Sequence, residues 1–457
     1  MKMMLKILIL LIVIALIVFI GWRLAKRNHL ITGITIPNIL PDPATSTKPV
    51  VISGDQILID LNKTETNLTG VGLGFTFGFD ATSPNRTLLE GLKPEYVRGP
   101  LWWFKSMPIA QRINSAGMRP QVILSDLEPT TGWTKGFWPG ENDNWTKWET
   151  YIGTIVREIE EKIGNRALEV DIFNEPTSIW VRHGKSVGWS NAEIQNNLTE
   201  TWRRAFLTIR KEAPTFKIAG PSFSGYDSQL LKGFIDFSAA NNVMPDILTW
   251  HELDSSTPEE IPTHVAEIKT YLATKNLNPK IQIQEYGPSN DPSNPVLMIR
   301  YFKNLEKAQI DASAKACWND PDGTSGCLNG RLDNLINGQG QAKSIWYAFK
   351  GYSQLSGKII TTTDNINFPS LVTFDLQNRK GGILLGSEKG GNISLKISNL
   401  PKTTGEITVQ IVKVPFSNSN TATPTTENRK IKIEGASTVI TLEKTAIKDI
   451  YLITLDF

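Results

Sequence analysis

The sequence predicts an α/β chain: a (β/α)8 TIM barrel, followed by a C-terminal antiparallel β-sandwich and preceded by an N-terminal transmembrane helix. Fourteen consecutive apolar residues near the N-terminus predict the transmembrane helix. Eight short apolar segments alternate with helical patterns and predict the barrel, because buried parallel strands are short, apolar and β-branched. A later run of strand-like segments without long helices predicts the sandwich.

The composition is that of a folded and nearly neutral chain. Its 457 residues exceed one ordinary core, so we expect two or three folded units. The 48 basic and 45 acidic residues leave a net charge of +3, which equals the basic residues that follow the apolar segment, Arg23, Lys26 and Arg27. This balance excludes the basic surface of a nucleic-acid-binding protein.

The apolar run at residues 7–20 is slightly short for a membrane span, but flanking lysines and Trp22 at the interface can extend it. A cleaved signal peptide is the alternative, yet no small-x-small cleavage site follows the run. We therefore expect a transmembrane signal anchor over residues 1–23 and a Pro- and Thr-rich linker over 24–49. The expected location is a single-pass cell-membrane protein with its large domain outside the cell.

The barrel is expected within residues 50–352. Helical patterns cover 145–163 and 191–212, the second with Asn191 as N-cap and Glu193 in its first turn. A doubly wound sheet is the alternative, but no glycine-rich phosphate loop follows the first strand. The predicted strands are 70–79, 95–101, 119–125, 168–174, 216–222, 246–252, 281–286 and 314–319.

The β-sandwich is expected over residues 353–457, where turns separate short strand-like segments. Residues 50–61 are also strand-like and are candidates to pair with these strands. The predicted sandwich strands are 368–375, 380–386, 392–398, 406–413, 429–434, 437–442 and 448–455.

Two glutamates are expected at the mouth of the barrel, where functional side chains gather at the carboxyl ends of strands. Glu175 lies in Asn174-Glu175-Pro176 after the fourth strand, and Glu285 ends the seventh. One such glutamate is more often a structural ion-pair partner, but two on these strands indicate chemistry. Retaining glycoside hydrolysis needs a proton-donating carboxyl and a nucleophilic carboxylate about 5–5.5 Å apart, with pKa values pushed apart by their environments.

These residues resemble clan A glycoside hydrolases, in which the acid/base glutamate follows an asparagine on strand four and the nucleophile lies on strand seven. The resemblance covers roughly residues 70–350. The appended sandwich and the preceding strand resemble family 39, which holds β-xylosidases and α-L-iduronidases. The resemblance implies a glycosidase that acts on O-glycosidic bonds of a polysaccharide or oligosaccharide, with Glu175 as acid/base and Glu285 as nucleophile, and without cofactor or metal.

The resemblance also implies substrate-binding roles. Asn174 would bind the sugar 2-hydroxyl, and Arg98 at the end of strand two would keep Glu285 ionised. Trp318 would form the floor of the first sugar site. The alternatives are a peripheral ion pair for Arg98 and barrel core for Trp318.

Strand six departs from the family pattern, because Leu253 stands where a tyrosine would contact the nucleophile. His251 is still expected to line the pocket, and Tyr286 could supply the missing hydroxyl. Glu252 could bind a sugar hydroxyl or point outward. This departure leaves open a barrel that binds polysaccharide without cleaving it, and transglycosylation with the same residues is a third possibility.

Tryptophans after strands two to four could stack on sugar rings, and Trp180 is assigned to substrate binding on this basis. Packing over the barrel is the alternative for several of them. Cys317 and Cys327 are the only cysteines and are candidates for a disulfide outside the reducing cytosol; two free buried thiols are the alternative. The tryptophans of these loops are Trp102, Trp103, Trp133, Trp138, Trp145, Trp180 and Trp189.

Overall fold

The computed structural model describes residues 56–124, 137–163, 168–253, 258–320, 322–363, 365–418 and 420–457. The predicted anchor at 1–23 and linker at 24–49 lie outside the described residues. Among the described helices, none combines the length and apolar character that a membrane crossing requires. The chain divides into two units, Met1–Ile52 and Ser53–Phe457, and every described residue belongs to the second.

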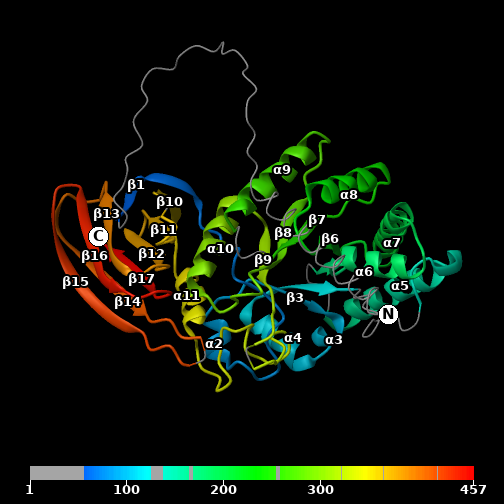
Figure 1. The fold of residues 1–457 in the computed structure, drawn as a ribbon, viewed down its shortest axis with the longest axis horizontal. Helices are drawn as coiled ribbons and strands as arrows, with labels where there is room; N and C mark the ends of the chain where they lie inside the picture. The colour runs from blue at the N-terminus through cyan, green and yellow to red at the C-terminus, as the bar shows by residue number, and fades with distance from the viewer. Residues whose placement is uncertain are drawn as a thin grey trace, which may run out of the picture. The chain divides into compact units, whose positions relative to one another are not determined.

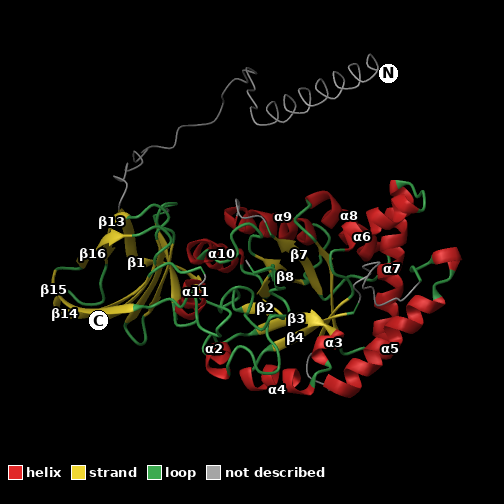
Figure 2. Ribbon diagram, turned by 60° about the horizontal axis from the view of Figure 1, so that its bottom comes forward, coloured by secondary structure: helices red, strands yellow, loops and turns green. Residues whose placement is uncertain are grey.

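Eight parallel strands close into a barrel in sequence order, from β2 to β9 (Figures 1 and 2). The predicted TIM barrel is therefore confirmed. Its first strand is shorter than predicted, and its last strand ends before the segment that carries Trp318. The strands are β2 Gly74–Thr76, β3 Tyr96–Pro100, β4 Arg119–Ile123, β5 Glu169–Asp171, β6 Lys217–Phe223, β7 Ile247–Glu252, β8 Lys280–Tyr286 and β9 Ala312–Lys315.

Helices surround the barrel, and the two long predicted helices form nearly as expected. The N-cap of α7 is Ser190 rather than Asn191. Its hydroxyl accepts from the Glu193 amide at 3.3 Å while the Glu193 carboxylate accepts from the Ser190 amide at 2.7 Å, a reciprocal pair that Asn191 cannot make from inside the helix. The helices are α2 Arg86–Glu90, α3 Leu101–Phe104, α4 Met107–Ala116, α5 Thr146–Ile163, α6 Pro176–Ser186, α7 Asn191–Glu212, α8 Ser228–Ala240, α9 Ile261–Ala273, α10 Pro295–Ala308 and α11 Ser344–Tyr352, with 3-10 turns η1 Glu141–Asp143 and η2 Pro258–Glu260.

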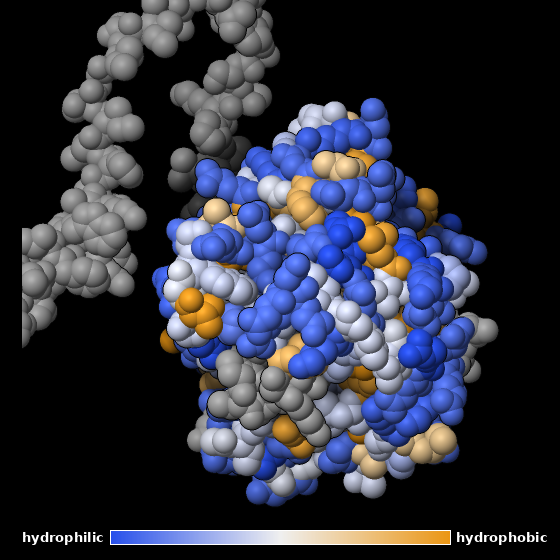
Figure 3. Space-filling model, turned by 90° about the vertical axis from the view of Figure 1, so that its right-hand side faces the viewer, coloured by the Kyte–Doolittle hydropathy of each residue, from blue (hydrophilic) through white to orange (hydrophobic). Residues whose placement is uncertain are grey.

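The inside of the barrel is polar, whereas the layer between strands and helices is apolar. Gln284 donates to Asp171 at 2.8 Å, Gln121 donates to Gln282 at 2.8 Å, and Gln282 donates to Glu169 at 2.9 Å, with all of these side chains buried. Side chains alternate between the two faces of a strand, so each strand contributes to both environments. On the side of α5 to α8 the outer surface is mostly hydrophilic, with apolar residues in small separate patches (Figure 3).

The C-terminal strands form one continuous nine-stranded sheet in the order β15-β14-β17-β12-β11-β10-β1-β13-β16. The predicted sandwich of separate antiparallel sheets is therefore replaced by a single, largely antiparallel sheet. The reason is β1, Gln56–Asn67, which pairs antiparallel with β10 on one side and parallel with β13 on the other. The other strands are β10 Lys358–Thr362, β11 Ser370–Asp375, β12 Lys380–Gly386, β13 Gly391–Ser398, β14 Thr404–Val414, β15 Thr425–Glu434, β16 Ser437–Thr445 and β17 Ile450–Asp456.

One face of this sheet has its own apolar core, and the other packs against α10 and α11 of the barrel. The fit is close: a Cβ placed at Gly386 would lie 2.5 Å from Val296, and one at Gly351 would lie 2.7 Å from Leu452. The barrel and the sheet therefore share a packed, glycine-dependent interface.

Candidate active site

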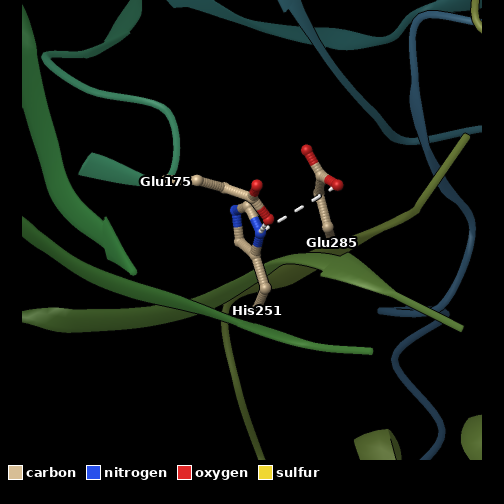
Figure 4. Close-up of side chains that lie close together, drawn as sticks. All are labelled: Glu175, His251 and Glu285. Atoms are coloured by element: carbon tan, nitrogen blue, oxygen red, sulfur yellow. Dashed lines mark hydrogen bonds and ion pairs between the residues drawn. The ribbon is translucent and has the colours of Figure 1, made fainter. Parts of the chain in front are cut away.

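Two glutamates and a histidine converge at the carboxyl ends of the barrel strands (Figure 4). Glu175 follows β5, His251 lies near the end of β7, and Glu285 lies near the end of β8. One carboxylate oxygen of each glutamate and one ring nitrogen of His251 all lie within 4.8 Å of one another. The carboxylates are thus as close as a double-displacement reaction at one sugar carbon requires.

The backbone holds the Glu175 side chain beside His251 and Glu285. Glu175 is in the left-handed conformation, with φ 47° and ψ 50°, and its amide donates to the carbonyl of Ser222 at 3.0 Å. Pro176 takes the first position of α6, where its missing N–H costs nothing. A non-glycine residue in this conformation is strained, and such strain concentrates at functional sites.

Arg98 lies beneath Glu285 and is fully buried. Its Nη1 donates to Glu285 Oε1 at 2.8 Å, and its Nη2 donates to Asn174 Oδ1 at 2.9 Å. Nε and Nη2 both reach Asp171 Oδ2, at 3.0 and 2.8 Å. Burial acts to lower the pKa of Arg98, but the charges of Asp171 and Glu285 outweigh it and raise that pKa. The arginine is therefore a permanent cation between two carboxylates.

Asp171 is a site residue that the sequence analysis did not identify. It is fully buried, and burial raises its pKa although Arg98 opposes the shift. Ser222 Oγ donates to its Oδ1 at 2.6 Å, and Gln284 Nε2 donates to its Oδ2 at 2.8 Å. The signal in the sequence was an acidic residue between two apolar ones, Val170-Asp171-Ile172, because a buried carboxylate needs a partner.

His251 pairs with Glu175, with 3.1 Å between His251 Nδ1 and Glu175 Oε1. This hydrogen bond is the largest influence on the Glu175 carboxyl and lowers its pKa, while burial acts in the opposite direction. His251 is completely buried, and its Nε2 has no hydrogen-bond partner among the described residues. Nδ1 is also 4.0 Å from Glu285 Oε2, so the imidazole contacts both carboxylates.

Asn174 and Trp318 lie beside this group. The Oδ1 atom of Asn174 accepts from Arg98, which leaves its amide NH2 as the group available to a ligand. Trp318 is partly buried, and its indole donates to the carbonyl of Gly287, two residues after Glu285, at 3.3 Å. Both residues therefore lie close to the two glutamates, and their binding of a substrate stays a prediction.

Tyr286, Glu252 and Trp180 do not reach the pocket, and their assignment to substrate binding is corrected. Tyr286 is fully buried and donates to the carbonyl of Gly72 at 2.6 Å. Glu252 accepts from the Trp250 indole at 2.8 Å and lies 2.9 Å from His264 on α9. Tyr286 and Glu252 follow site residues directly, so strand alternation turns them toward the helices.

Trp180 is 1% exposed and packs against Trp138 and Phe173, with ring centroids 4.9 and 5.2 Å away. It lies on α6 and faces the neighbouring helix, where its indole donates to Asn197 at 2.9 Å. Among the described tryptophans of the mouth loops, Trp102 is exposed, at 52%, and lies edge-on to Phe77. Trp133 lies outside the described residues.

The disulfide candidates Cys317 and Cys327 are bonded to each other. They close the start of the segment between β9 and α11, which is tied to the chain after β2. The Gly78 amide donates to the carbonyl of Cys327 at 3.2 Å, and the Leu332 amide donates to the carbonyl of Gly78 at 2.7 Å. The disulfide thus fixes the loop that carries Trp318.

Glu175, His251 and Glu285 have the donor types and spacing of a metal-ligand set. Arg98 already provides a positive charge at 2.8 Å from Glu285. A cation placed between the carboxylates would be repelled by this guanidinium, which favours carboxylate chemistry over metal binding.

No family model matches the chain. It is 25% identical over 446 residues to a 3-O-alpha-D-galactosyl-alpha-L-arabinofuranosidase of Bifidobacterium longum subsp. longum, with 83% of this chain and 38% of the relative covered. It is 24% identical over 258 residues to a 3-O-beta-L-arabinopyranosyl-alpha-L-arabinofuranosidase of Bifidobacterium pseudocatenulatum, with 50% of this chain and 25% of the relative covered. The chain thus spans well under half the length of both relatives.

Solved structures share the fold over nearly the whole chain. N2152 from Neocallimastix frontalis matches with a TM-score of 0.72 and 22% identity, covering 88% of this chain and 100% of that one. A GH39 enzyme from Xanthomonas axonopodis pv. citri matches with a TM-score of 0.61 and 16% identity, covering 90% and 100%. A β-xylosidase from Caulobacter crescentus CB15 matches with a TM-score of 0.62 and 14% identity, covering 88% and 99%. The resemblance to clan A glycoside hydrolases is therefore confirmed in the fold.

Proposed function

We propose that the protein is a retaining glycoside hydrolase that cleaves O-glycosidic bonds of an oligosaccharide or polysaccharide. The observation that carries the proposal is the approach of Glu175 and Glu285 to within 4.8 Å, with Arg98 bound to Glu285 alone of the two. That asymmetry gives the carboxyls different surroundings, because only Glu285 accepts a hydrogen bond from the arginine.

In the first step, Glu285 attacks the anomeric carbon and Glu175 donates its proton to the leaving oxygen. This forms a glycosyl–enzyme ester and releases the first product. In the second step, Glu175 takes a proton from water as that water attacks the same carbon, which releases the sugar and restores both carboxyls. Asn174 offers its amide to the sugar hydroxyl next to the reacting carbon, a contact that strengthens in the transition state.

His251 reconciles the acid role of Glu175 with its lowered pKa. Because Nδ1 lies 3.1 Å from Glu175 Oε1, it can accept a hydrogen bond from the protonated carboxyl or donate one to the carboxylate. The same partner therefore serves Glu175 as acid in the first step and as base in the second. The bond favours the charged form in the free protein, so we expect an acidic pH optimum.

The substrate is proposed from the relatives. The names of the two curated relatives specify α-L-arabinofuranosidases, and one structural neighbour is a β-xylosidase. We therefore propose a pentoside substrate, with the α-L-arabinofuranoside tested first and the β-D-xylopyranoside second.

The test is hydrolysis of activated aryl glycosides by wild type and by two variants. Glu285→Ala should lower kcat/KM by at least about 10³-fold, because no ester can form. Glu175→Gln should lower kcat by a similar factor, because no base then activates the water that hydrolyses the ester. Azide should restore turnover of Glu285→Ala and yield a glycosyl azide of inverted configuration, since azide then attacks in place of the nucleophile.

Glu252→Gln is the matched control, because Glu252 is also a strand-end carboxylate but contacts His264 and Trp250 rather than the pocket. It should keep kcat/KM within about threefold of wild type. Substantial turnover in both Glu285→Ala and Glu175→Gln would overturn the proposal.

We also propose that residues 1–23 anchor the protein in the cell membrane with its large domain outside. The Cys317–Cys327 bond supports an oxidising environment, since such bonds are rare in the cytosol. Membrane fractionation of the full chain, followed by protease treatment of intact cells, tests this placement. Recovery in the soluble fraction, or protection of the whole chain, would contradict it.

A further inference from the structure

A groove with a row of polar side chains lies on the nine-stranded sheet, away from the two glutamates. Its volume is about 520 Å³. Its floor is the outer face of strands β11, β12, β17, β14 and β15. Its side wall is formed by Lys93 and by the residues that follow α11, Gln354 to Ser356. Every residue that lines the groove belongs to the described part of the chain.

The floor of the groove is a straight row across five strands. Thr373 pairs with Gly382, and Gly382 pairs with Thr454. Thr454 pairs with Gln410, which pairs with Asn428. Neighbouring strands lie about 4.8 Å apart, so the four steps span about 19 Å. The floor is therefore a line of hydroxyl and amide groups, interrupted by one glycine and long enough for a chain ligand.

The neighbouring row on the same face explains why a groove exists. Leu384 and Leu452 are partners in that row and pack against Gly351 at the end of α11. The barrel therefore covers the apolar row and leaves the polar row uncovered beside it. A Cβ at Gly382 would lie only 2.6 Å from the Leu355 side chain, so any larger residue at position 382 would fill the groove.

Thr373 gives independent evidence for a ligand. Its side chain is 1% exposed and lines the groove, yet its Oγ1 has no hydrogen-bond partner among the residues that the structure describes. An unpaired buried hydroxyl costs free energy, and native structures rarely keep one without a use. At the other end of the row, Gln410 Nε2 donates to Asn428 Oδ1 at 3.2 Å, which leaves the Gln410 carbonyl and the Asn428 amide for a ligand.

The groove opens at the end of the barrel opposite to the glutamates. Lys93 precedes β3, and residues 354–356 follow the last turn of α11, so both belong to the face where barrel strands begin. Glu175 and Glu285 lie where the strands end. A ligand in the groove therefore does not occupy the catalytic pocket.

We propose that this groove is a second, non-catalytic binding site for a neutral glycan chain. The floor residues are uncharged hydrogen-bonding groups, which suit a chain rich in hydroxyls. The charged lining residues stand outside this row: Lys93 lies on the wall, and Lys380 and Asp456 lie 3.7 Å apart and offset each other. The site would hold the polymer on the enzyme while the pocket acts on it, and its existence does not depend on hydrolysis.

The experiment measures binding of soluble arabinoxylan and arabinogalactan by affinity electrophoresis. It uses the full chain carrying Glu285→Gln, which prevents digestion of the probe. Adding Gln410→Ala and Thr454→Ala, both at exposed floor positions, should weaken binding about tenfold or more through the lost hydrogen bonds. Thr404→Ala, exposed on β14 but outside the groove, is the matched control and should bind as the parent does.

Thr373→Val sharpens the test, because it removes only the unpaired hydroxyl and preserves shape. It should weaken glycan binding without lowering the melting temperature, whereas a hydroxyl with a purely structural role would leave binding unchanged. Equal binding by the groove variants and the parent would overturn the proposal, as would no binding to any probe. Groove-dependent binding in a protein that hydrolyses no glycoside would sink the proposed catalytic function and leave this site standing.

Discussion

The barrel interior and the layer behind it receive neighbouring residues of the same strands and use them differently. His251 and Glu285 face the interior, where they contact each other and Glu175. Glu252 and Tyr286, one residue later, face the helices, where they bond to His264 and Gly72. Both pairs follow the alternation of a β-strand. A shift of one residue therefore separates a position in the proposed catalytic site from a structural one.

Substitutions on the two faces of a strand should therefore have different effects, which can be measured. Interior substitutions should slow the reaction even at temperatures where the variant stays folded, because they alter the charges around Glu285. Substitutions in the layer should change stability and leave the reaction intact, because they alter packing between strands and helices.

Asp171→Asn is expected to give the largest effect. Asp171 orients Arg98 through two nitrogens, at 2.8 and 3.0 Å, so its loss lets the guanidinium move away from Glu285. A small misplacement of a catalytic group costs about 10²-fold in rate, so kcat should fall by that factor while KM changes little. Kinetics on an aryl glycoside test this, and Asp171→Glu should recover part of the rate.

An Asp171→Asn protein with wild-type kcat would show that Arg98 needs no buried anion. Asp171, although buried in the barrel interior, would then not contribute to the reaction. Because breaking a buried pair is also destabilising, by about 3–5 kcal/mol, the rate is to be measured at a temperature where the variant remains folded.

His251 tests the interior through pH. Glu175 must be protonated to act as acid, so activity falls as pH rises through its pKa, and the His251 bond lowers that pKa. His251→Leu removes the bond, which raises the Glu175 pKa and should move the alkaline limb of kcat/KM to higher pH. His251→Asn can still place a donor near Glu175 and should shift the limb less. The pH–rate profiles of the three proteins decide this, and identical alkaline limbs would contradict it.

Tyr286→Phe tests the layer. The variant loses the hydroxyl that donates to the Gly72 carbonyl in a buried site, so unfolding free energy should fall by about 1–3 kcal/mol. Its kcat/KM should stay within about twofold of wild type. Tyr271→Phe is the control, because that hydroxyl binds the exposed Asp236, and the change should be below about 0.5 kcal/mol. A large loss of activity in Tyr286→Phe would place the tyrosine in the site after all.

The sequence predicted the parts of the molecule that local pattern controls. The eight barrel strands could be predicted because each has a short apolar segment. Glu175 and Glu285 could be predicted as site residues because each lies at the end of a strand. Alternation counted from Gln284, which faces the interior, would place Tyr286 inside as well. The register shift between Ile283 and Tyr286 brings Glu285 to the interior and turns Tyr286 toward Tyr301 on α10. Asp171 was missed because its role depends on Arg98, 73 residues away in the chain.

The sheet shows a second limit of sequence patterns. Its strands were found from their alternation, except for β10, but pairing was not, since β1 meets β13 from more than three hundred residues away. Register between distant strands depends on tertiary packing, which no local pattern contains. The polar groove was equally invisible, because its floor combines single residues from five strands.

The smallest expected effect is that of substituting Trp102, at the mouth of the barrel. Trp102 and Trp103 are neighbours on α3, yet Trp102 is 52% exposed and Trp103 is 4% exposed. Trp102 follows the strand that carries Arg98, so its free face can stack on a sugar bound beyond the pocket. Trp102→Ala should raise KM for an oligosaccharide about fivefold, since one aromatic contact contributes about 1 kcal/mol, and leave KM for a small aryl glycoside unchanged.

Trp103→Phe is the counterpart, because the Trp103 indole donates to the carbonyl of Phe79 at 3.0 Å within the core. It should lower the melting temperature and leave both KM values unchanged. If Trp102→Ala instead changes stability and spares KM, the exposed tryptophan is part of the packing over the barrel. Trp102 would then belong with the structural residues rather than with the site.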